Sequence, residues 1–181
     1  MTYAEHFGPA AFIARARTEG VRDFGTVLAP QSAFYLLQGM ETLALRMDRH
    51  LANAKVVLDF LANHEAVGWV RHPDLPDHPN HAVAQRQLPK GTTSMIVFGV
   101  KGGFDAGRKL INSVKLASHV SNVGDAKTLL VHPASTTHMQ LGPEQRKLAG
   151  VPDDMIRLSV GIEHVDDIID DLRASLRVSQ R

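Results

Sequence analysis

The sequence predicts an α/β (α+β-like) fold, in which an open sheet is covered by helices and preceded by a mainly helical arm. Up to about residue 52 the apolar residues recur at helical spacing; beyond it, short apolar runs separated by turn residues alternate with helical segments. A chain of 181 residues, 44% of them hydrophobic, can bury one core and still carry an extension. We therefore expect a single compact domain with an appendage.

Two helical segments make up the arm. Ile13, Val21 and Phe24 fall at roughly helical spacing between residues 10 and 24, and Pro30 marks a break after them. The longest periodic segment follows, where apolar residues step by three or four positions between 40 and 61. Such a helix is long enough to connect two structural units.

The sequence pattern of the remainder of the chain predicts a sheet whose strands are connected by helices. Short apolar runs bounded by Gly, Pro and Asn predict strands at 67–70, 94–100, 128–131 and 155–160. Helical patterns occupy 81–88 and 104–114. The last segment is an amphipathic helix from Val165, with acids early and arginines late, as the helix dipole favours.

Composition excludes several classes of partner. Twenty Lys and Arg against 19 Asp and Glu give a net charge of +1, too balanced for a nucleic-acid backbone or an anionic membrane to be the default partner. The absence of cysteine removes disulfides and thiolate zinc sites, and it is compatible with the reducing cytosol. The first residues lack the apolar run of a signal peptide. We expect a cytoplasmic protein that binds neither nucleic acid nor membrane.

Arg157 is the most informative candidate for a binding residue. Strand alternation places Ile156, Leu158 and Val160 on one face, and Arg157 with Ser159 on the other. A guanidinium on a rigid strand can bind a carboxylate through two hydrogen bonds. The alternative is a solvated arginine on an outer face.

Other polar clusters have weaker patterns. The loop 132–138 collects hydroxyls and two imidazoles that could orient a polar ligand, and residues 122–125 are typical of a turn. His72, His78 and His81, with two aspartates, are possible zinc ligands, but three prolines make this an irregular loop and we assign no metal. We find no Ser-His-Asp set and no paired catalytic carboxylates.

Six motifs together resemble the Cys/Met-metabolism family of pyridoxal-phosphate (PLP) enzymes. In chain order they are AEHFGPAAFI at 4–13, QGMETLALRM at 38–47, FGVKGG at 98–103, NVGDAKTL at 122–129, HPASTTH at 132–138 and IRLSVGIE at 156–163. The first and fourth are similar to the O-acetylhomoserine sulfhydrylase branch. The resemblance covers essentially the whole chain.

The resemblance implies the C-terminal part of PLP fold type I, with a mostly antiparallel sheet. Residues 1–52 would be the tail of the large domain with the connecting helix, and 53–181 the small domain. It also implies replacement of the acetate of O-acetylhomoserine by sulfide to give homocysteine, with PLP as cofactor. In this reading Arg157 binds the substrate α-carboxylate with Asn122 beside it, and Thr137 and His138 lie near the substrate pocket.

One departure from the family's pattern limits that expectation. The Schiff-base lysine, in a Ser-x-Thr-Lys segment, and the other PLP-anchoring residues precede the motifs found here, and none of the seven lysines has that context. We therefore expect no catalytic or cofactor-binding residue in the chain, and we expect the chain by itself to be inactive. Partners would be an amino-acid substrate and either further copies of the chain or a complementing N-terminal fragment. The alternatives are a fragment of a cystathionine γ-synthase or γ-lyase type enzyme, or a non-catalytic small binding domain.

Overall fold

A computed structural model describes residues 2–181, which form two compact units, 2–44 and 45–181. The first unit contains α1 (Tyr3–Phe7), η1 (Gly8–Ala10), α2 (Ala11–Arg15), the π-helical η2 (Ala16–Asp23) and α3 (Pro30–Glu41). Thr2 and Glu5 form a reciprocal capping box at the start of α1. The hydroxyls of Tyr3 and Thr18 share a hydrogen bond of 2.6 Å. None of residues 2–44 is buried.

The boundary expected at Pro30 is wrong in one respect. Pro30 marks a break, but it is also the first residue of α3. Its fixed φ suits the first position of a helix, and the backbone N–H that proline lacks would have no hydrogen-bond partner within the helix at that position. The long helix predicted from residue 40 is likewise divided: α3 ends at Glu41, and α4 runs from Leu43 to Ala62.

A four-stranded sheet forms the centre of the second unit. Its strands are β1 (Val67–Arg71), β2 (Met95–Val100), β3 (Leu129–Val131) and β4 (Met155–Ser159), in the order β1-β2-β4-β3. All three strand pairs are antiparallel. The expectation of an open, mostly antiparallel sheet is confirmed.

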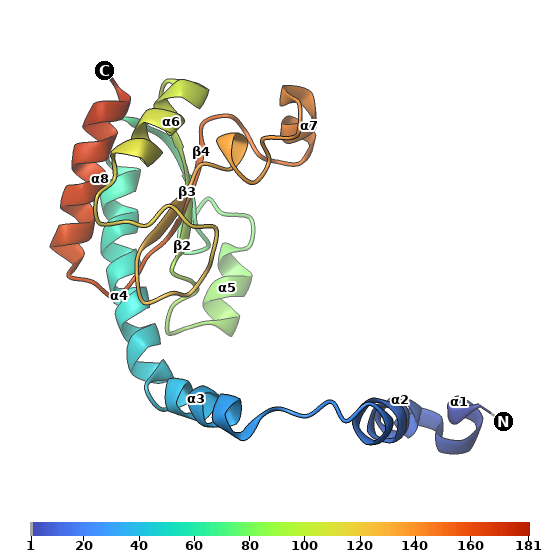
Figure 1. Ribbon diagram of the computed structural model, residues 1–181. Helices are drawn as coiled ribbons and strands as arrows, with labels where there is room; N and C mark the ends of the chain where they lie inside the picture. The colour runs from blue at the N-terminus through green and yellow to red at the C-terminus, as the bar shows by residue number, and fades with distance from the viewer. Residues whose placement is uncertain (1) are drawn as a thin grey trace. The chain divides into compact units, whose positions relative to one another are not determined.

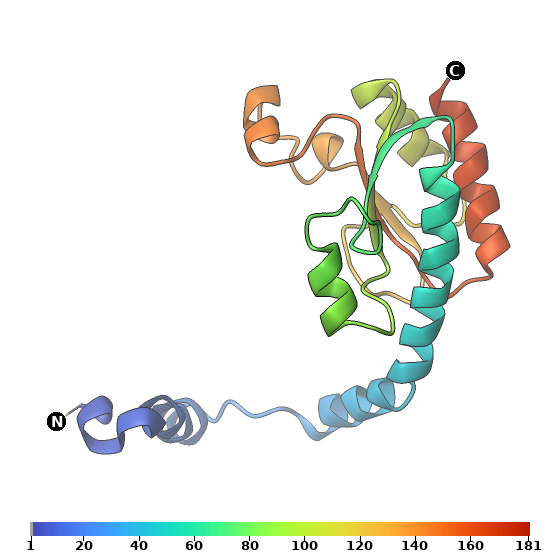
Figure 2. The same cartoon turned by 180° about the vertical axis from the view of Figure 1, so that it is seen from behind.

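Helices cover one face of this sheet. The second unit also contains α5 (His81–Gln87), α6 (Gly103–Ser113), η3 (Pro133–Ser135), α7 (Pro143–Leu148) and α8 (Val165–Ser179). Figures 1 and 2 show α4, α6 and α8 on the same side of the strands. Their apolar faces meet the inward side chains of β2 and β4, including Phe98, Ile156 and Leu158, each 0% exposed. The core therefore lies on one side of the sheet.

The opposite side of the sheet is less covered, and we call it the open face. It carries Trp69, Arg71, Val97, Met155 and Arg157, which alternate along their strands with core residues. Arg71 is exposed and the other four are half-buried. Polar groups on this face can therefore meet a ligand without entering the core.

Buried polar contacts fix α4 to the end of β4. His50, 2% exposed, donates from Nδ1 to the carbonyl of Val160 at 2.7 Å. Asn53 donates to the carbonyls of Gly161 and Glu163, each at 2.9 Å. Since buried polar groups need partners, these bonds specify one position of the helix against the strand. Among residues 2–181, no helix is long and apolar enough to cross a membrane.

Candidate functional site

Arg157 lies on the open face at the middle of β4. Its neighbours Ile156 and Leu158 point into the core, as strand alternation predicted. The guanidinium Nη2 donates a hydrogen bond of 2.9 Å to Ser121 Oγ. Within residues 2–181 no carboxylate lies within ion-pair distance of it. The positive charge is thus oriented but not neutralised, which is the state required to receive an anion.

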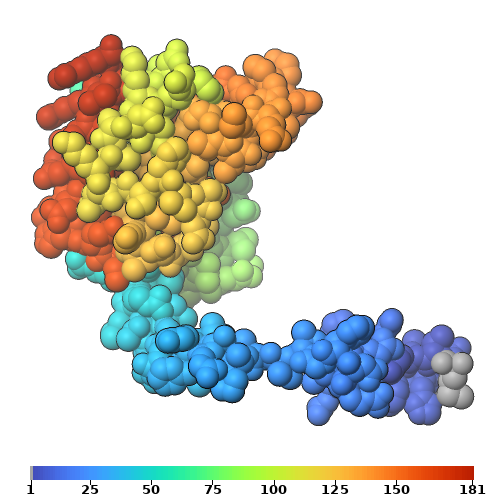
Figure 3. Space-filling model, viewed as in Figure 1, coloured from blue at the N-terminus to red at the C-terminus, as the bar shows by residue number. Residues whose placement is uncertain are grey.

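The segment that carries Ser121, residues 115–127, is held by hydrogen bonds on both sides of that residue. Asp171 of α8 accepts hydrogen bonds from the amides of residues 115–117, where the chain leaves α6. Farther along, the amide of Gly124 donates to Ser159 Oγ at 3.3 Å. Figure 3 shows residues 115–127 (yellow) at the surface of this unit. Ser159 is 2% exposed although it shares the face of Arg157, a burial that alternation alone does not predict.

Asn122, predicted beside Arg157, is exposed on this segment. In the part of the chain that the structure describes, its side chain makes no hydrogen bond to Arg157; the neighbouring Ser121 makes it instead. Sequence reasoning did not identify Ser121. Its one signal was its position directly before the Asn-Val-Gly-Asp turn.

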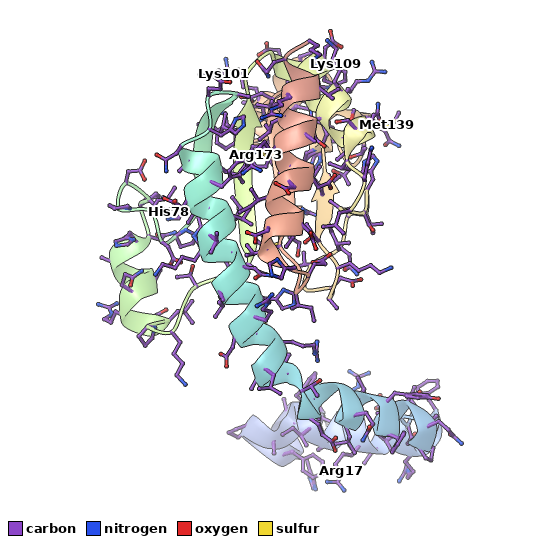
Figure 4. All side chains as sticks on the ribbon, turned by 90° about the vertical axis from the view of Figure 1, so that its left-hand side faces the viewer. Arg17, His78, Lys101, Lys109, Met139 and Arg173 are labelled. Carbon is purple, nitrogen blue, oxygen red and sulfur yellow. The ribbon has the colours of Figure 1, made fainter. Side chains whose placement is uncertain are left out.

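Thr137 and His138 form a second polar group, on the segment that follows η3. The hydroxyl of Thr137 and Nδ1 of His138 are hydrogen-bonded at 2.8 Å, on the exposed side of the loop. No hydrogen bond between residues 2 and 181 joins this pair to Arg157. Figure 4 shows Met139, the next residue, and His78 on opposite sides of the unit. The structure therefore joins Arg157 to Ser121 by a hydrogen bond, whereas Thr137 and His138 are hydrogen-bonded to each other.

His132, at the start of the same loop, is a structural residue. It is 0% exposed, donates from Nε2 to the carbonyl of Asp153 at 2.7 Å and accepts from Ser135 Oγ at 2.8 Å. Burial lowers the pKa of His132, with the Asp153 carbonyl acting in the opposite direction. The ring packs edge-on against Phe104. A neutral imidazole here joins the loop to the segment directly before β4.

The histidines considered for zinc are used in loop hydrogen bonds. His72 Nε2 donates to the carbonyl of Thr93 and its Nδ1 accepts from the amide of Asp74. His81 Nδ1 donates to the carbonyl of Pro73 at 2.9 Å. No group of three possible metal ligands is found among residues 2–181. These ring nitrogens are thus engaged in hydrogen bonds within the loop and with Thr93.

The chain's lysines do not fit a covalent PLP site. All seven are exposed, and none is a residue of the paired strands. A lysine that forms a Schiff base needs a desolvated pocket that lowers its pKa. The described residues therefore fit the binding of a carboxylate and not the anchoring of PLP.

Comparisons with known proteins agree with the motifs. Residues 9–177 match the family described as Cys/Met metabolism PLP-dependent enzyme. The chain is 47% identical over 172 residues to O-acetyl-L-homoserine sulfhydrylase 1 of Thermus thermophilus, which covers 95% of this chain and 41% of that protein. It is 47% identical over 158 residues to an L-methionine gamma-lyase of Fusobacterium nucleatum, with 87% of this chain and 40% of the relative covered.

A solved structure from Campylobacter jejuni gives the same result in three dimensions. That protein is described as an O-acetylhomoserine (thiol)-lyase and carries N′-pyridoxyl-lysine-5′-monophosphate. Its TM-score is 0.81 at 37% sequence identity, over 91% of this chain and 39% of the solved chain. The chain thus spans about two fifths of the length of the relatives that it matches.

Proposed function

The chain belongs to the Cys/Met metabolism family of PLP-dependent enzymes, and on this premise we propose that it supplies the C-terminal part of an O-acetylhomoserine sulfhydrylase. The complete protein would replace the acetate of O-acetylhomoserine with sulfide to give homocysteine. The identity to the Thermus relative supports this branch. In the same proposal, residues 1–52 belong to the large domain and the connecting helix, and residues 53–181 to the small domain.

The role of these residues in the proposal is to bind the substrate. Arg157 receives the α-carboxylate through two parallel N–H···O bonds, and Ser121 holds the guanidinium in position. Asn122, Thr137 and His138 are the further residues assigned to the substrate pocket. The observation that carries the proposal is the guanidinium of Arg157, oriented by Ser121 and without a carboxylate partner among residues 2–181.

The proposed function does not extend to residues that hold the cofactor. The seven exposed lysines do not fit the PLP anchor, so we derive no catalytic step from the described residues. The complete protein would act in the cytoplasm on an amino-acid substrate, as a homo-oligomer or with a complementing polypeptide that supplies the anchor.

A γ-lyase activity is the alternative within the family, supported by the Fusobacterium relative. A non-catalytic amino-acid-binding domain is the alternative outside enzymes. Both retain a carboxylate site at Arg157, so they are separated by turnover of the complete protein with O-acetylhomoserine plus sulfide and with methionine. Homocysteine from the first mixture supports the sulfhydrylase, and release of methanethiol from the second supports the lyase.

A titration of the chain itself tests the carboxylate site. O-acetyl-L-homoserine should shift the amide NMR signals of residues 121–124 and 157, whereas its uncharged carboxamide analogue should not. Arg157→Lys should weaken binding about tenfold, because a point charge cannot reproduce the planar two-pronged contact. Arg177→Lys, at an exposed position of α8, is the matched control and should bind as the unchanged chain does. Equal binding by both variants would remove Arg157 from the site.

A further inference from the structure

Two arginines lie in one row across the open face. Strand register pairs Arg71 of β1 with Val97 of β2, and Val97 with Arg157 of β4. Residues paired directly across neighbouring strands share a face, so both guanidinium groups start from the same side of the sheet. Two strand spacings separate their Cα atoms, a distance of about 10 Å.

Neither of these charges is neutralised by the chain. Other arginines form ion pairs: Arg15 with Glu19, Arg146 with Asp153 and Arg173 with Asp170. Within the described residues, 2–181, neither Arg71 nor Arg157 has a carboxylate within 4.0 Å. Asp77 lines the same cavity as Arg71 without pairing with it. The open face thus presents two free cations.

Trp69 holds Arg71 over the sheet. The indole Nε1 donates to Asp154 Oδ2 at 2.8 Å, which joins β1 to the residue directly before β4. The ring crosses β2 at Gly99, where a Cβ atom would overlap the indole. Arg71 Cζ lies 5.4 Å from the ring centroid, within the range of a cation–π contact. The guanidinium is therefore positioned along the face that Arg157 shares, and it does not extend freely from the edge strand.

The space beside Arg71, at the β1 end of this row, is open and partly apolar. A cavity of about 620 Å³ there is lined by Trp69, Arg71, His78 and Pro152, among others, but not by Val97 or Arg157, and its volume is in the range of small-molecule sites. Figure 4 shows His78 on the loop that follows β1. Between the two arginines the row is occupied by half-buried Val97. Across the three strands a cation, an apolar side chain and a second cation therefore follow one another. This order is complementary to a ligand in which methylene groups join two carboxylates.

We propose that Arg71 is a second anion-binding position of this site, so that the open face binds amino acids with a terminal carboxylate, one carboxylate at Arg157 and the other at Arg71. The α-carboxylate half rests on the proposed function. O-acetylhomoserine has a neutral acyl group and engages Arg157 alone. A dicarboxylic amino acid engages both arginines and competes with that substrate for the face.

A matched pair of ligands tests the second position. L-2-aminoadipate and L-norleucine have chains of equal carbon number and differ in the terminal carboxylate. In NMR titrations of the 181-residue chain, 2-aminoadipate should bind roughly tenfold more tightly, because one more charge-assisted contact is made. Glutamate and 2-aminopimelate, one carbon shorter and longer, locate the best spacing.

Variants assign the preference to a residue. Arg71→Gln should abolish the preference for the diacid and leave norleucine binding unchanged, while Arg71→Lys should keep part of it. Arg177→Gln on α8 is the control and should change neither affinity. The proposal is overturned if the unchanged chain shows no preference for any diacid, or if Arg71→Gln retains it with a native spectrum.

Arg157→Gln separates this proposal from the proposed function. It should weaken both ligands, because both place an α-carboxylate there. If it weakens neither while Arg71→Gln still abolishes the diacid preference, the α-carboxylate assignment fails and the anion site at Arg71 stands.

Discussion

Asp171 provides the sharpest test of how the segment around Ser121 is held. Its Oδ1 accepts from the amide of Lys115 at 2.8 Å, and its Oδ2 accepts from the amides of Leu116 and Ala117 at 3.0 Å each. One carboxylate on α8 thus satisfies three consecutive N–H groups where α6 ends. We expect Asp171→Ala to destabilise the fold and to loosen the contact of Ser121 with Arg157.

The loss in the free energy of unfolding depends on which of the three amides stays buried in Asp171→Ala. Hydrogen bonds to charged groups are worth about 1.5–3 kcal/mol each, so a plain sum over the three would be about 4.5–9 kcal/mol. Residues Lys115 and Leu116 are exposed, and water replaces the carboxylate at their amides. Ala117 is 9% exposed, so its amide remains without a partner at a penalty of about 1–3 kcal/mol. We therefore expect a loss near 2 kcal/mol.

Urea denaturation followed by circular dichroism measures this loss. Asp170→Ala is the control, because Asp170 is exposed and forms an ion pair with Arg173 in the same helix. That pair should contribute less than about 1 kcal/mol. Equal free energies of unfolding for the two variants would refute the role given to Asp171. A second measurement is spectroscopic: the Ser121 amide signal should broaden in Asp171→Ala and not in Asp170→Ala.

Four further predictions address other parts of the molecule. Gly99→Ala should displace the indole of Trp69, the single tryptophan, and shift its fluorescence to longer wavelength. The free energy of unfolding should fall by about 1–3 kcal/mol. The control is Gly20→Ala, which has open space around it and should leave the emission unchanged. Because burial lowers the pKa of His132, the unfolded chain takes up its proton first as pH falls, so the free energy of unfolding should decrease below about pH 6.5 and level off below the folded pKa. His132→Gln should flatten that slope, while His64→Gln, which removes the other histidine with a lowered pKa, should leave most of it. The chain mixed with PLP and reduced with borohydride should yield no adduct at a single lysine and no homocysteine; an adduct mapped to one lysine, with turnover, would contradict the expectation drawn from its exposed lysines. In sedimentation at rising concentration the chain should self-associate through exposed apolar residues such as Phe12 and Phe24, 84% and 82% exposed, and a strictly monomeric chain would contradict this.

Local periodicity predicted the four strands of the second unit and its helices α5, α6 and α8, but not the short α7. The strands at 67–70, 94–100, 128–131 and 155–160 lie within a residue or two of β1 to β4, because alternating burial leaves a local record in the sequence. Residues 30–39, nearly all of α3, were missed, since Pro30 is compatible with both a break and a helix start. The domain boundary near residue 52 stays a prediction; the compact units meet between Ala44 and Leu45.

The site was less accessible to sequence reasoning than the elements. Arg157 could be placed on an outer face because its neighbours in the strand are core residues. Ser121 lies 36 positions away along the chain, and its contact depends on how the loop is tied to Asp171 and Ser159. The row of Arg71, Val97 and Arg157 depends on strand order and register, which no local pattern records.

The two units differ in what stabilises them, and this difference bears on where binding specificity can reside. Residues 45–181 bury an apolar core beneath the sheet, whereas none of residues 2–44 is buried. Short helices without a buried face are marginal in water, so the first unit gains little stability from its own packing. The open face has the opposite property, because its charged side chains project from strands that the core already fixes. Arg71 and Arg157 are therefore positioned before any ligand arrives, and discrimination between one and two carboxylates requires only that their separation be kept.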